Sequence, residues 1–376
     1  MVFKFSQKDN QKINDEERLI KKLDNFDNKA IFINGFPASG KTMLCPIVSS
    51  INKVESVIFP YEIEWMGSLL YTNDTTRHGF EEFVKQFCDH TIYCQMMGRN
   101  SNFRRGDITS VLNKKDFMKY AKRLFGKGDN DIPKQINDQK PILCFSATHL
   151  SFVIEEIFSA LEARCLYIEI VRDPIYMFKQ IKILFEEIYN KNPKKFFTFT
   201  FSLNKEKYLF YDFYNDRNNL TSLNKIDNLN YNVVNYLEKI CNFYFNLNFE
   251  KIKTKNSKLI LLPFENFVIK PDLWIGEILN FLDQAQTPNL TNELKRQNVP
   301  RKVLTQGFKR EVYERYGNKI ISEKELKNTS YDDADSKYIE DIKNYIGEKD
   351  SEAFKKLLKI SKNYRAWIKG FNKFAF

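Results

Sequence analysis

The stretch KAIFINGFPASGKTML, residues 29–44, decides which fold the sequence predicts. Its apolar run at 30–34 is typical of a fully buried strand. Residues 35–42 then match the pattern G-x-x-x-x-G-K-[ST], and a predicted helix begins at Met43 despite Pro46 in its first turn. A glycine-rich turn that joins a buried strand to a helix is the context in which this pattern binds phosphate.

The residue types of this turn suit an anion. Glycines allow backbone N–H groups to turn toward a phosphate, and the N-terminus of the following helix adds roughly half a positive charge. Lys41 supplies an ammonium group and Thr42 a hydroxyl group. We therefore predict a phosphate site formed by Gly35, Pro37, Ala38, Ser39, Gly40, Lys41, Thr42 and Met43.

Short apolar segments alternate with helical patterns along the rest of the chain. Strands are predicted at 30–34, 55–58, 142–145, 165–171 and 259–263, and helices at 79–125, 152–163, 175–189, 236–248, 274–282 and about 335–366. This alternation predicts an α/β fold of the P-loop nucleotide-binding type, with a doubly wound parallel sheet and helices on both faces. Ligands of such sheets bind beyond the carboxyl ends of the strands, so we expect the site just after residues 34, 145 and 171.

The chain of 376 residues is expected to form a single domain, 1–376. A helical and aromatic insertion is predicted at about 190–250, where Asn, Lys and aromatic residues are frequent. A polar and largely helical C-terminal extension is predicted at about 300–376. With 43% hydrophobic residues, the chain can bury a large core.

The composition limits the partners of the chain. The net charge of +11 favours anionic ligands, but no dense Lys/Arg block with interleaved aromatic residues is present, so we expect no nucleic acid partner. No window approaches the roughly 20 apolar residues that a membrane span needs, and the N-terminus lacks the apolar run of a signal peptide. We expect a cytoplasmic protein without stable membrane insertion, and the sequence carries no signal for an oligomeric state.

No metal site is expected either. Cys88, His90 and Cys94 are close in sequence, but they fall on a predicted amphipathic helix and no second ligand pair follows. The six cysteines are scattered, mostly in apolar surroundings, as is typical of reduced buried thiols.

Three segments, in this order, resemble the sulfotransferase family that uses 3′-phosphoadenosine-5′-phosphosulfate (PAPS). The loop at 35–42 resembles the family's P-x-S-G-T-T loop, and CLYIEIVRDPIYMFKQ at 165–180 is similar to its strand that ends in Arg-Asn/Asp-Pro. LILLPFENFVIKPDLWIGEILNFLD at 259–283 resembles its later signature of an apolar strand, an acidic residue, a Pro and a helix that ends in Phe-Leu. Order and spacing agree over about 250 residues.

The resemblance implies how the donor would be bound. The loop would grip the 5′-phosphosulfate of PAPS, or the 5′-phosphate of 3′,5′-adenosine bisphosphate (PAP), and Arg172 would bind the 3′-phosphate. Gln180 stands where the family has Ser, and its amide can donate a hydrogen bond to the same phosphate. The loop departs from the family at two positions, with Ala38 in place of Lys or Arg and Lys41 in place of Thr, so a positive charge has moved by three positions.

The family's late Arg-Lys-Gly loop has a distant counterpart in Arg301, Lys302 and Gly307. Since charged runs are usually solvated, we interpret the two basic residues as exposed charge. They are therefore not among the predicted site residues.

Two candidates for the catalytic base follow from the resemblance. SATHL at 146–150 resembles the K-T-H-L segment of the cytosolic branch, in which the His is the base, so His149 is one candidate. The alternative for His149 is a hydrogen-bonded histidine at a strand end. Another branch places a Glu about two dozen residues after the loop, where Glu62 and Glu64 lie. Glu64 is the preferred one of this pair, and the alternative is that both flank a strand and face water.

These residues predict a sulfotransferase that moves a sulfuryl group from PAPS to a hydroxyl or amine of a saccharide or other small molecule by in-line displacement. Catalytic roles fall to Lys41, which would neutralise the leaving phosphate without a metal, and to His149 or Glu64 as the base. The alternative is an ATP-dependent P-loop kinase for a small molecule or sugar, with Asp173 or Glu265 as a magnesium ligand. A nucleotide-binding regulatory protein without turnover is a third interpretation.

Overall fold

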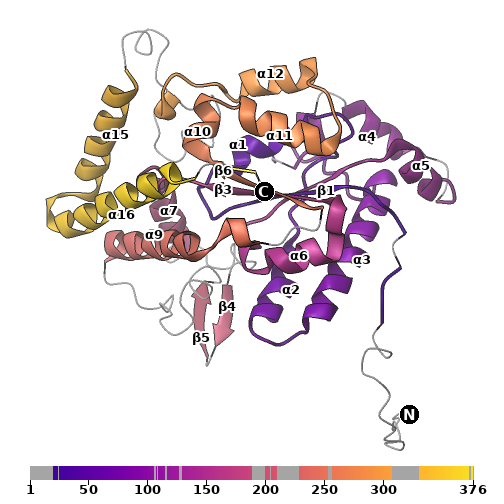
Figure 1. Ribbon diagram of the computed structural model, residues 1–376, viewed down its shortest axis with the longest axis horizontal. Helices are drawn as coiled ribbons and strands as arrows, with labels where there is room; N and C mark the ends of the chain where they lie inside the picture. The colour runs from indigo at the N-terminus through magenta and orange to yellow at the C-terminus, as the bar shows by residue number, and fades with distance from the viewer. Residues whose placement is uncertain are drawn as a thin grey trace, which may run out of the picture.

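A parallel β-sheet forms the centre of the molecule (Figure 1). The computed structural model describes residues 20–188, 200–209, 228–306 and 330–375, apart from positions 24, 106, 108, 115, 116, 127, 128, 204, 253–255, 372 and 373. The strands lie in the order β2-β1-β3-β6 and are all parallel, with the bounds β1 (Ala30–Asn34), β2 (Leu143–Ser146), β3 (Cys165–Val171) and β6 (Lys258–Pro263). The sequence predicts each of these four strands to within one residue, and the predicted parallel sheet is confirmed.

The predicted strand at 55–58 is wrong. This segment lies beside β2 but pairs with it only through two isolated bridges, made by Val54 and Ile58. Between the bridges, the carbonyl oxygen of Ser56 accepts a hydrogen bond from Gln95 Nε2 at 3.0 Å. The backbone is thus directed partly toward a helix instead of β2, and the pairing remains interrupted.

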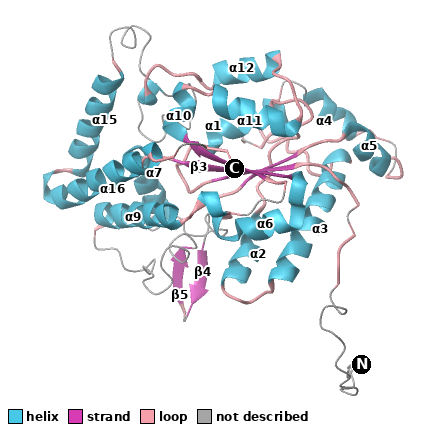
Figure 2. Cartoon of the chain, in the orientation of Figure 1, coloured by secondary structure: helices cyan, strands magenta, loops and turns pink. Residues whose placement is uncertain are grey.

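Helices cover both faces of the sheet, as Figures 1 and 2 show. Their bounds are α1 (Lys41–Ser49), α2 (Tyr61–Tyr71), α3 (Arg77–Met96), α4 (Phe117–Arg123), α5 (Ile132–Gln139), α6 (Ile154–Leu161), α7 (Pro174–Glu186), α9 (Leu229–Asn246), α10 (Phe264–Ile269), α11 (Asp272–Leu282), α12 (Pro288–Arg296), α15 (Tyr331–Ile346) and α16 (Ser351–Lys369). In the view of Figure 1, α1, α10, α11 and α12 lie above the sheet, and α2, α3 and α6 lie below it. The helices α7, α9, α15 and α16 gather at one end and pack on one another. The predicted α/β fold with helices on both faces is confirmed.

Two glycines end helices that the sequence predicts to be longer. The stretch 79–125 is predicted to be mostly helical, but α3 stops at Met96 and Gly98 follows with a φ of 82°. The predicted helix at 335–366 is instead two helices, α15 and α16, and Gly347 between them has a φ of 85°. Glycine adopts such left-handed conformations readily, and helices commonly terminate there.

The predicted insertion and extension lie partly outside the described residues. At 190–250, the described part holds a hairpin of β4 (Thr200–Leu203) and β5 (Glu206–Leu209) and the helix α9. After residue 300, it holds a 3₁₀ turn, Leu304–Gln306, followed by α15 and α16. The single-domain organisation stays a prediction, although one cluster of buried side chains joins the sheet to both of these helices.

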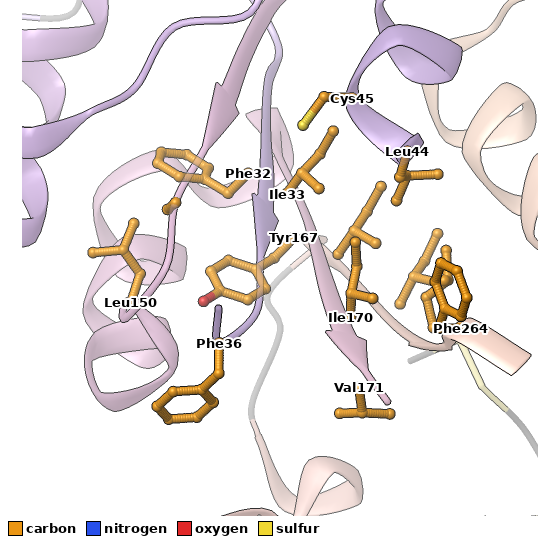
Figure 3. Close-up of a cluster of buried hydrophobic side chains, with 14 of the residues drawn as sticks. Phe32, Ile33, Phe36, Leu44, Cys45, Leu150, Tyr167, Ile170, Val171 and Phe264 are labelled. Carbon is orange, nitrogen blue, oxygen red and sulfur yellow. The ribbon is translucent and has the colours of Figure 1, made fainter. Parts of the chain in front are cut away.

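The strands next to the predicted site are buried on both faces of the sheet. All five residues of β1 are buried, and Phe32 packs against Phe145 with ring centroids 4.9 Å apart. Figure 3 shows Leu44 of α1, Ile170 of β3 and Phe264 of α10 in one apolar cluster. Burial on both sides explains why these strands read as continuous apolar runs, and it fixes the ends of β1 and β3 against their neighbours.

The remaining expectations concern thiols and membranes. All six cysteines are buried and free, as predicted. Cys88, His90 and Cys94 lie on α3, where the sequence predicts a helix. In the part of the chain that the structure describes, no helix is long and apolar enough to cross a membrane. The cytoplasmic location stays a prediction.

A buried ion pair ties α4 to the segment beside β2. Glu55 has no exposed surface, and its two carboxylate oxygens accept hydrogen bonds from Arg123 at 2.8 and 2.9 Å. Lys119 donates a further hydrogen bond to Oε1 at 2.8 Å. Burial alone would raise the pKa of Glu55, but the hydrogen bonds and charge of Arg123, together with nearby lysines, lower it to about 2.

Arg123→Met is expected to lower the free energy of unfolding by about 3–5 kcal/mol, because it leaves the Glu55 carboxylate buried without its main partner. Urea unfolding measures this loss, and Lys119→Met, which removes the more exposed partner, should have a smaller effect. The pKa of Glu55 is depressed in the folded state, so the wild-type advantage should shrink as the pH falls from the ordinary value of 4.5 toward about 2. A loss below about 1 kcal/mol would show that the pair contributes little.

Candidate functional site

The predicted site lies at a switch point of the sheet. β1 is in the middle, the chain reaches β2 on one side of it, and β3 lies on the other side. Between two such neighbours, the connections diverge and leave a crevice beyond the carboxyl ends of the strands. The loop at 35–40 follows β1, and Arg172 follows β3. The topology therefore brings two segments that are far apart in sequence to the same edge.

The loop is shaped by two glycines that approach other backbone and side chains closely. Gly35 has a φ of 150°, and a Cβ atom there would lie 2.5 Å from the carbonyl oxygen of Ile170. Gly40 has a φ of 112°, and a Cβ atom there would lie 2.3 Å from the ring of Phe264. Gly40 is also the N-cap of α1, which has neither a side-chain cap nor an acidic residue in its first turn. The N–H groups of this turn therefore form a surface suited to an anion.

Lys41 keeps its ammonium group on the loop. Its Nζ donates hydrogen bonds to the carbonyl oxygen of Gly35 and, at 3.2 Å, to that of Phe36. Burial lowers the pKa of Lys41 to about 8, and nearby acidic groups, including Glu64 and Glu169, oppose the shift. At pH 7 most molecules therefore carry a positive charge at this position.

A cavity of about 240 Å³ opens beside the loop. Most of the predicted donor-binding residues line it, namely Pro37, Ala38, Ser39, Gly40, Lys41, Thr42, Met43, Arg172 and Gln180. Gly35 stands outside this lining. Arg172 Nη1 donates a hydrogen bond to the carbonyl oxygen of Ala38 at 2.9 Å, and its guanidinium lies 4.3 Å from the centre of the Phe264 ring. The structure thus brings the loop and Arg172 together, as the sequence predicts.

The lining also contains residues that are not among the predicted site residues, namely Tyr176, Lys179, Phe264, Arg301, Leu304, Thr305 and Tyr338. Tyr176 and Lys179 could have been found, because they follow Arg172 at helical spacing on α7. Tyr338 belongs to α15, whose place in the fold depends on tertiary packing that local sequence does not reveal.

The position of Arg301 differs from the prediction. The sequence predicts that Arg301 is exposed to solvent, but the residue is only 5% exposed. Its backbone N–H donates to the carbonyl oxygen of Val268 at 2.6 Å, and its Nη1 donates to that of Leu304 at 3.2 Å. These contacts dock the turn onto α10 and hold the guanidinium in the cavity wall. Lys302 is exposed as predicted, and Gly307 lies outside the described residues.

All charged side chains in the described lining of the cavity are basic. Lys41, Arg172, Lys179 and Arg301 are part of it, and no Asp or Glu is. Asp173 and Glu265, the magnesium ligands of the kinase interpretation, have other partners. Asp173 pairs with Arg365 at 2.6 Å, and Glu265 accepts hydrogen bonds from the backbone N–H of Asp173 at 3.0 Å and from the hydroxyl of Tyr364 at 3.1 Å.

Within the described ranges, no group of three His, Cys, Asp or Glu residues is arranged to hold a metal ion. A kinase site needs acidic or polar ligands for magnesium next to the phosphates. The observed lining therefore gives the kinase interpretation no support.

Glu64 and His149 lie together in the interior of the protein. Glu64 belongs to α2 and is 3% exposed, so the alternative that it flanks a strand and faces water is wrong, whereas Glu62 on the same helix is exposed. Glu64 Oε1 accepts a hydrogen bond from the backbone N–H of Thr148 and lies 3.9 Å from His149 Nδ1. Neither acid–base candidate is in the lining of this cavity.

The two candidates have very different proton affinities. Burial raises the pKa of Glu64 to about 7, although the Thr148 hydrogen bond and the charge of Lys41 oppose the rise. Burial and the charge of Lys41 lower the pKa of His149 to about 3. Near neutral pH, Glu64 is therefore present in both its protonated and its ionised form, whereas His149 is neutral.

No protein-family model matches the sequence, and no curated protein matches it. Among solved structures, the chain is similar to the sulfotransferase domain from the curacin biosynthetic pathway, with a TM-score of 0.33 and 14% identity over 84% of this chain and 92% of that one. It is also similar to the sulfotransferase domain from the Synechococcus PCC 7002 olefin synthase, with a TM-score of 0.36 and 12% identity over 93% and 98%. Both are sulfotransferase domains. At these TM-scores the similarities carry no functional argument, and the proposed function rests on the chemistry of the site.

Proposed function

We propose that this protein is a sulfotransferase that moves a sulfuryl group from PAPS to a hydroxyl or amine of a small acceptor. One observation carries the proposal: the phosphate loop and Arg172 share a cavity whose described lining holds four basic side chains and no carboxylate. PAPS is an adenosine with anionic groups at both its 3′ and 5′ positions. A cavity whose charged side chains are all cations, on separate segments of the chain, suits such a ligand without a metal ion.

Two buried polar atoms at the cavity support this fit. Ser39 Oγ and Arg172 Nε have no hydrogen-bond partner among the described residues. Both can donate to a phosphate oxygen, and a buried donor without a partner is unfavourable unless a ligand supplies one. The guanidinium of Arg172 would recognise the 3′-phosphate, with Arg301 and Gln180 beside it.

When bound, PAPS supplies the sulfuryl group and a bridging oxygen on which negative charge builds as the sulfur–oxygen bond breaks. The Lys41 ammonium and the N–H groups of the first turn of α1 would stabilise that charge, and the Thr42 hydroxyl lies on the same turn. Because these donors are already held on the loop, they need little reorganisation during the reaction. The stabilisation is greater in the transition state than in the ground state.

Glu64 is the base that the proposal favours. A pKa near 7 suits a group that accepts the acceptor's proton at neutral pH, and Lys41 favours its ionised form. His149 would then form part of the buried environment of Glu64. Tyr61 and Trp65 lie one turn apart on α2, and Glu64 lies between them in sequence. The two aromatic residues are 39% and 46% exposed. Such aromatic surface can stack on a ring, which supports a saccharide or other cyclic acceptor.

Binding of PAP without magnesium is the direct test of the donor site. We expect calorimetry to show that the full chain binds PAP more tightly than 5′-AMP, which lacks the 3′-phosphate. Arg172→Ala should weaken PAP binding about ten- to hundredfold and change AMP binding much less, because it removes charge-assisted hydrogen bonds to one phosphate. Lys302→Ala removes a nearby exposed charge and should leave both affinities unchanged.

Two outcomes would contradict the proposal. A strong preference for ATP with magnesium would favour a kinase, and binding of PAP without turnover of any hydroxyl or amine acceptor would favour a regulatory protein.

A further inference from the structure

The C-terminal helices α15 and α16 converge on the turn that carries Arg172. This turn leads from β3 into α7, and Asp173 caps α7 by accepting a hydrogen bond from the backbone N–H of Ile175 at 3.1 Å. Asp173 is 1% exposed. Its backbone N–H is held by Glu265, and its carboxylate faces α16. The conformation of the residue next to Arg172 therefore depends on contacts from two other elements.

Arg365 of α16 connects this turn to α15. Its Nε donates to Asp173 Oδ2 at 2.6 Å, while Nη1 and Nη2 donate to the two carboxylate oxygens of Asp335 at 2.7 and 3.1 Å. Asp335 also accepts a hydrogen bond from the hydroxyl of Tyr176, which lines the donor cavity. The guanidinium of Arg365 thus holds the carboxylates of both Asp173 and Asp335. Its planar set of N–H donors can bond to both carboxylates at once, which an ammonium group cannot do.

The same helix pair supplies part of the cavity wall. Tyr338 of α15 lines the cavity, and its ring stacks on that of Tyr176 with centroids 4.7 Å apart and an interplanar angle of 20°. Lys179 Nζ lies 5.7 Å from the centre of the Tyr338 ring. Part of the cavity wall therefore comes from a segment more than 150 residues further along the sequence than Arg172.

We propose that the C-terminal helix pair is a built-in part of the donor site, in which Arg365 is a positioning residue that sets the protein's preference for a 3′-phosphorylated adenine nucleotide. Arg365 acts through Asp173 and Asp335. Asp173 adjoins Arg172, and Asp335 accepts the Tyr176 hydroxyl beside the stacked ring of Tyr338, so Arg365 orients both parts of the cavity wall. This inference rests on the proposed function, since it assigns the 3′-phosphate to Arg172.

The test compares Arg365→Met with Lys356→Met in the full chain. Lys356 is on the same helix and forms an ion pair with Glu238 at 2.6 Å, which anchors α16 to α9 without involving the Arg172 turn. Titration calorimetry gives the dissociation constants for PAP and for 5′-AMP, and their ratio measures discrimination by the 3′-phosphate. We expect Arg365→Met to lower this ratio about tenfold and Lys356→Met to leave it within about twofold of the wild type.

Each outcome decides a different point. If both variants weaken PAP and AMP equally, or if Arg365→Met keeps the wild-type ratio, the helix pair is only a structural support and the inference is wrong. If Arg365→Met does not fold, Arg365→Lys gives the same comparison, because it keeps the charge but not the fork that spans two carboxylates. A wild-type protein without any preference for PAP over AMP would overturn the proposed function itself, and the inference with it.

Discussion

Glu64→Gln is expected to reduce kcat about 10²–10⁴-fold, because it removes the group that accepts the acceptor's proton. The amide can still accept the hydrogen bond from the Thr148 backbone, so the loss would come from acid–base chemistry and not from local unfolding. The pH profile gives a sharper readout. Glu64 must be ionised and its pKa is about 7, so kcat/KM of the wild type should rise as the pH increases through about 7. In Glu64→Gln this acidic limb should disappear.

His149→Gln is the matched control for that experiment. The imidazole lies 3.9 Å from Glu64 and its pKa is lowered to about 3, so it does not titrate near neutral pH. We expect the variant to keep the acidic limb near pH 7, whatever its effect on kcat. If the limb vanished with His149→Gln and persisted with Glu64→Gln, then His149 would be the base.

Lys41→Met is expected to lower kcat about 10²–10³-fold, the loss typical of removing one preorganised donor from a developing negative charge. The wild-type kcat/KM should fall as the pH rises through about 8, because Lys41 is then deprotonated in the free protein. This basic limb should be absent from the variant. Steady-state kinetics at several pH values measure both effects.

Lys179→Met separates transition-state stabilisation from simple attraction of the donor. Lys179 lines the same cavity but lies on α7, away from the loop residues that would hold the leaving group. Its loss should raise KM for PAPS more than it lowers kcat, as expected for uniform binding. A Lys41→Met variant with the same pattern as Lys179→Met would show that Lys41 is not catalytic.

The parts of the site that the sequence predicts are those set by local chemistry. The loop at 35–42 can be recognised because its glycines are required by close contacts with Ile170 and Phe264. Arg172 can be recognised because Pro174 and the capping Asp173 mark the start of α7 immediately after a buried strand. In both cases a strand end and a helix start fix the position of the functional group within a few residues.

The parts that sequence cannot predict depend on packing between distant segments. Arg301 reads as solvated charge because runs of charged residues are usually exposed, yet a turn docked on α10 buries Arg301 and leaves Lys302 exposed. Glu64 falls in a helix whose inward face is known only once α2 has packed against the region of Thr148. The side chains of Tyr338 and Arg365 join the site through the C-terminal helices, and no motif marks either of them.

The contact between Gly40 and the ring of Phe264 links two positions that are 224 residues apart. With a Cβ atom at 40, the ring would have to leave the wall on which the guanidinium of Arg172 rests. A larger residue at 40 would therefore be unfavourable twice, because its φ of 112° suits only glycine and because it would displace the ring under the arginine. Engineering of the loop should therefore keep Gly40 and treat it and Phe264 as one unit.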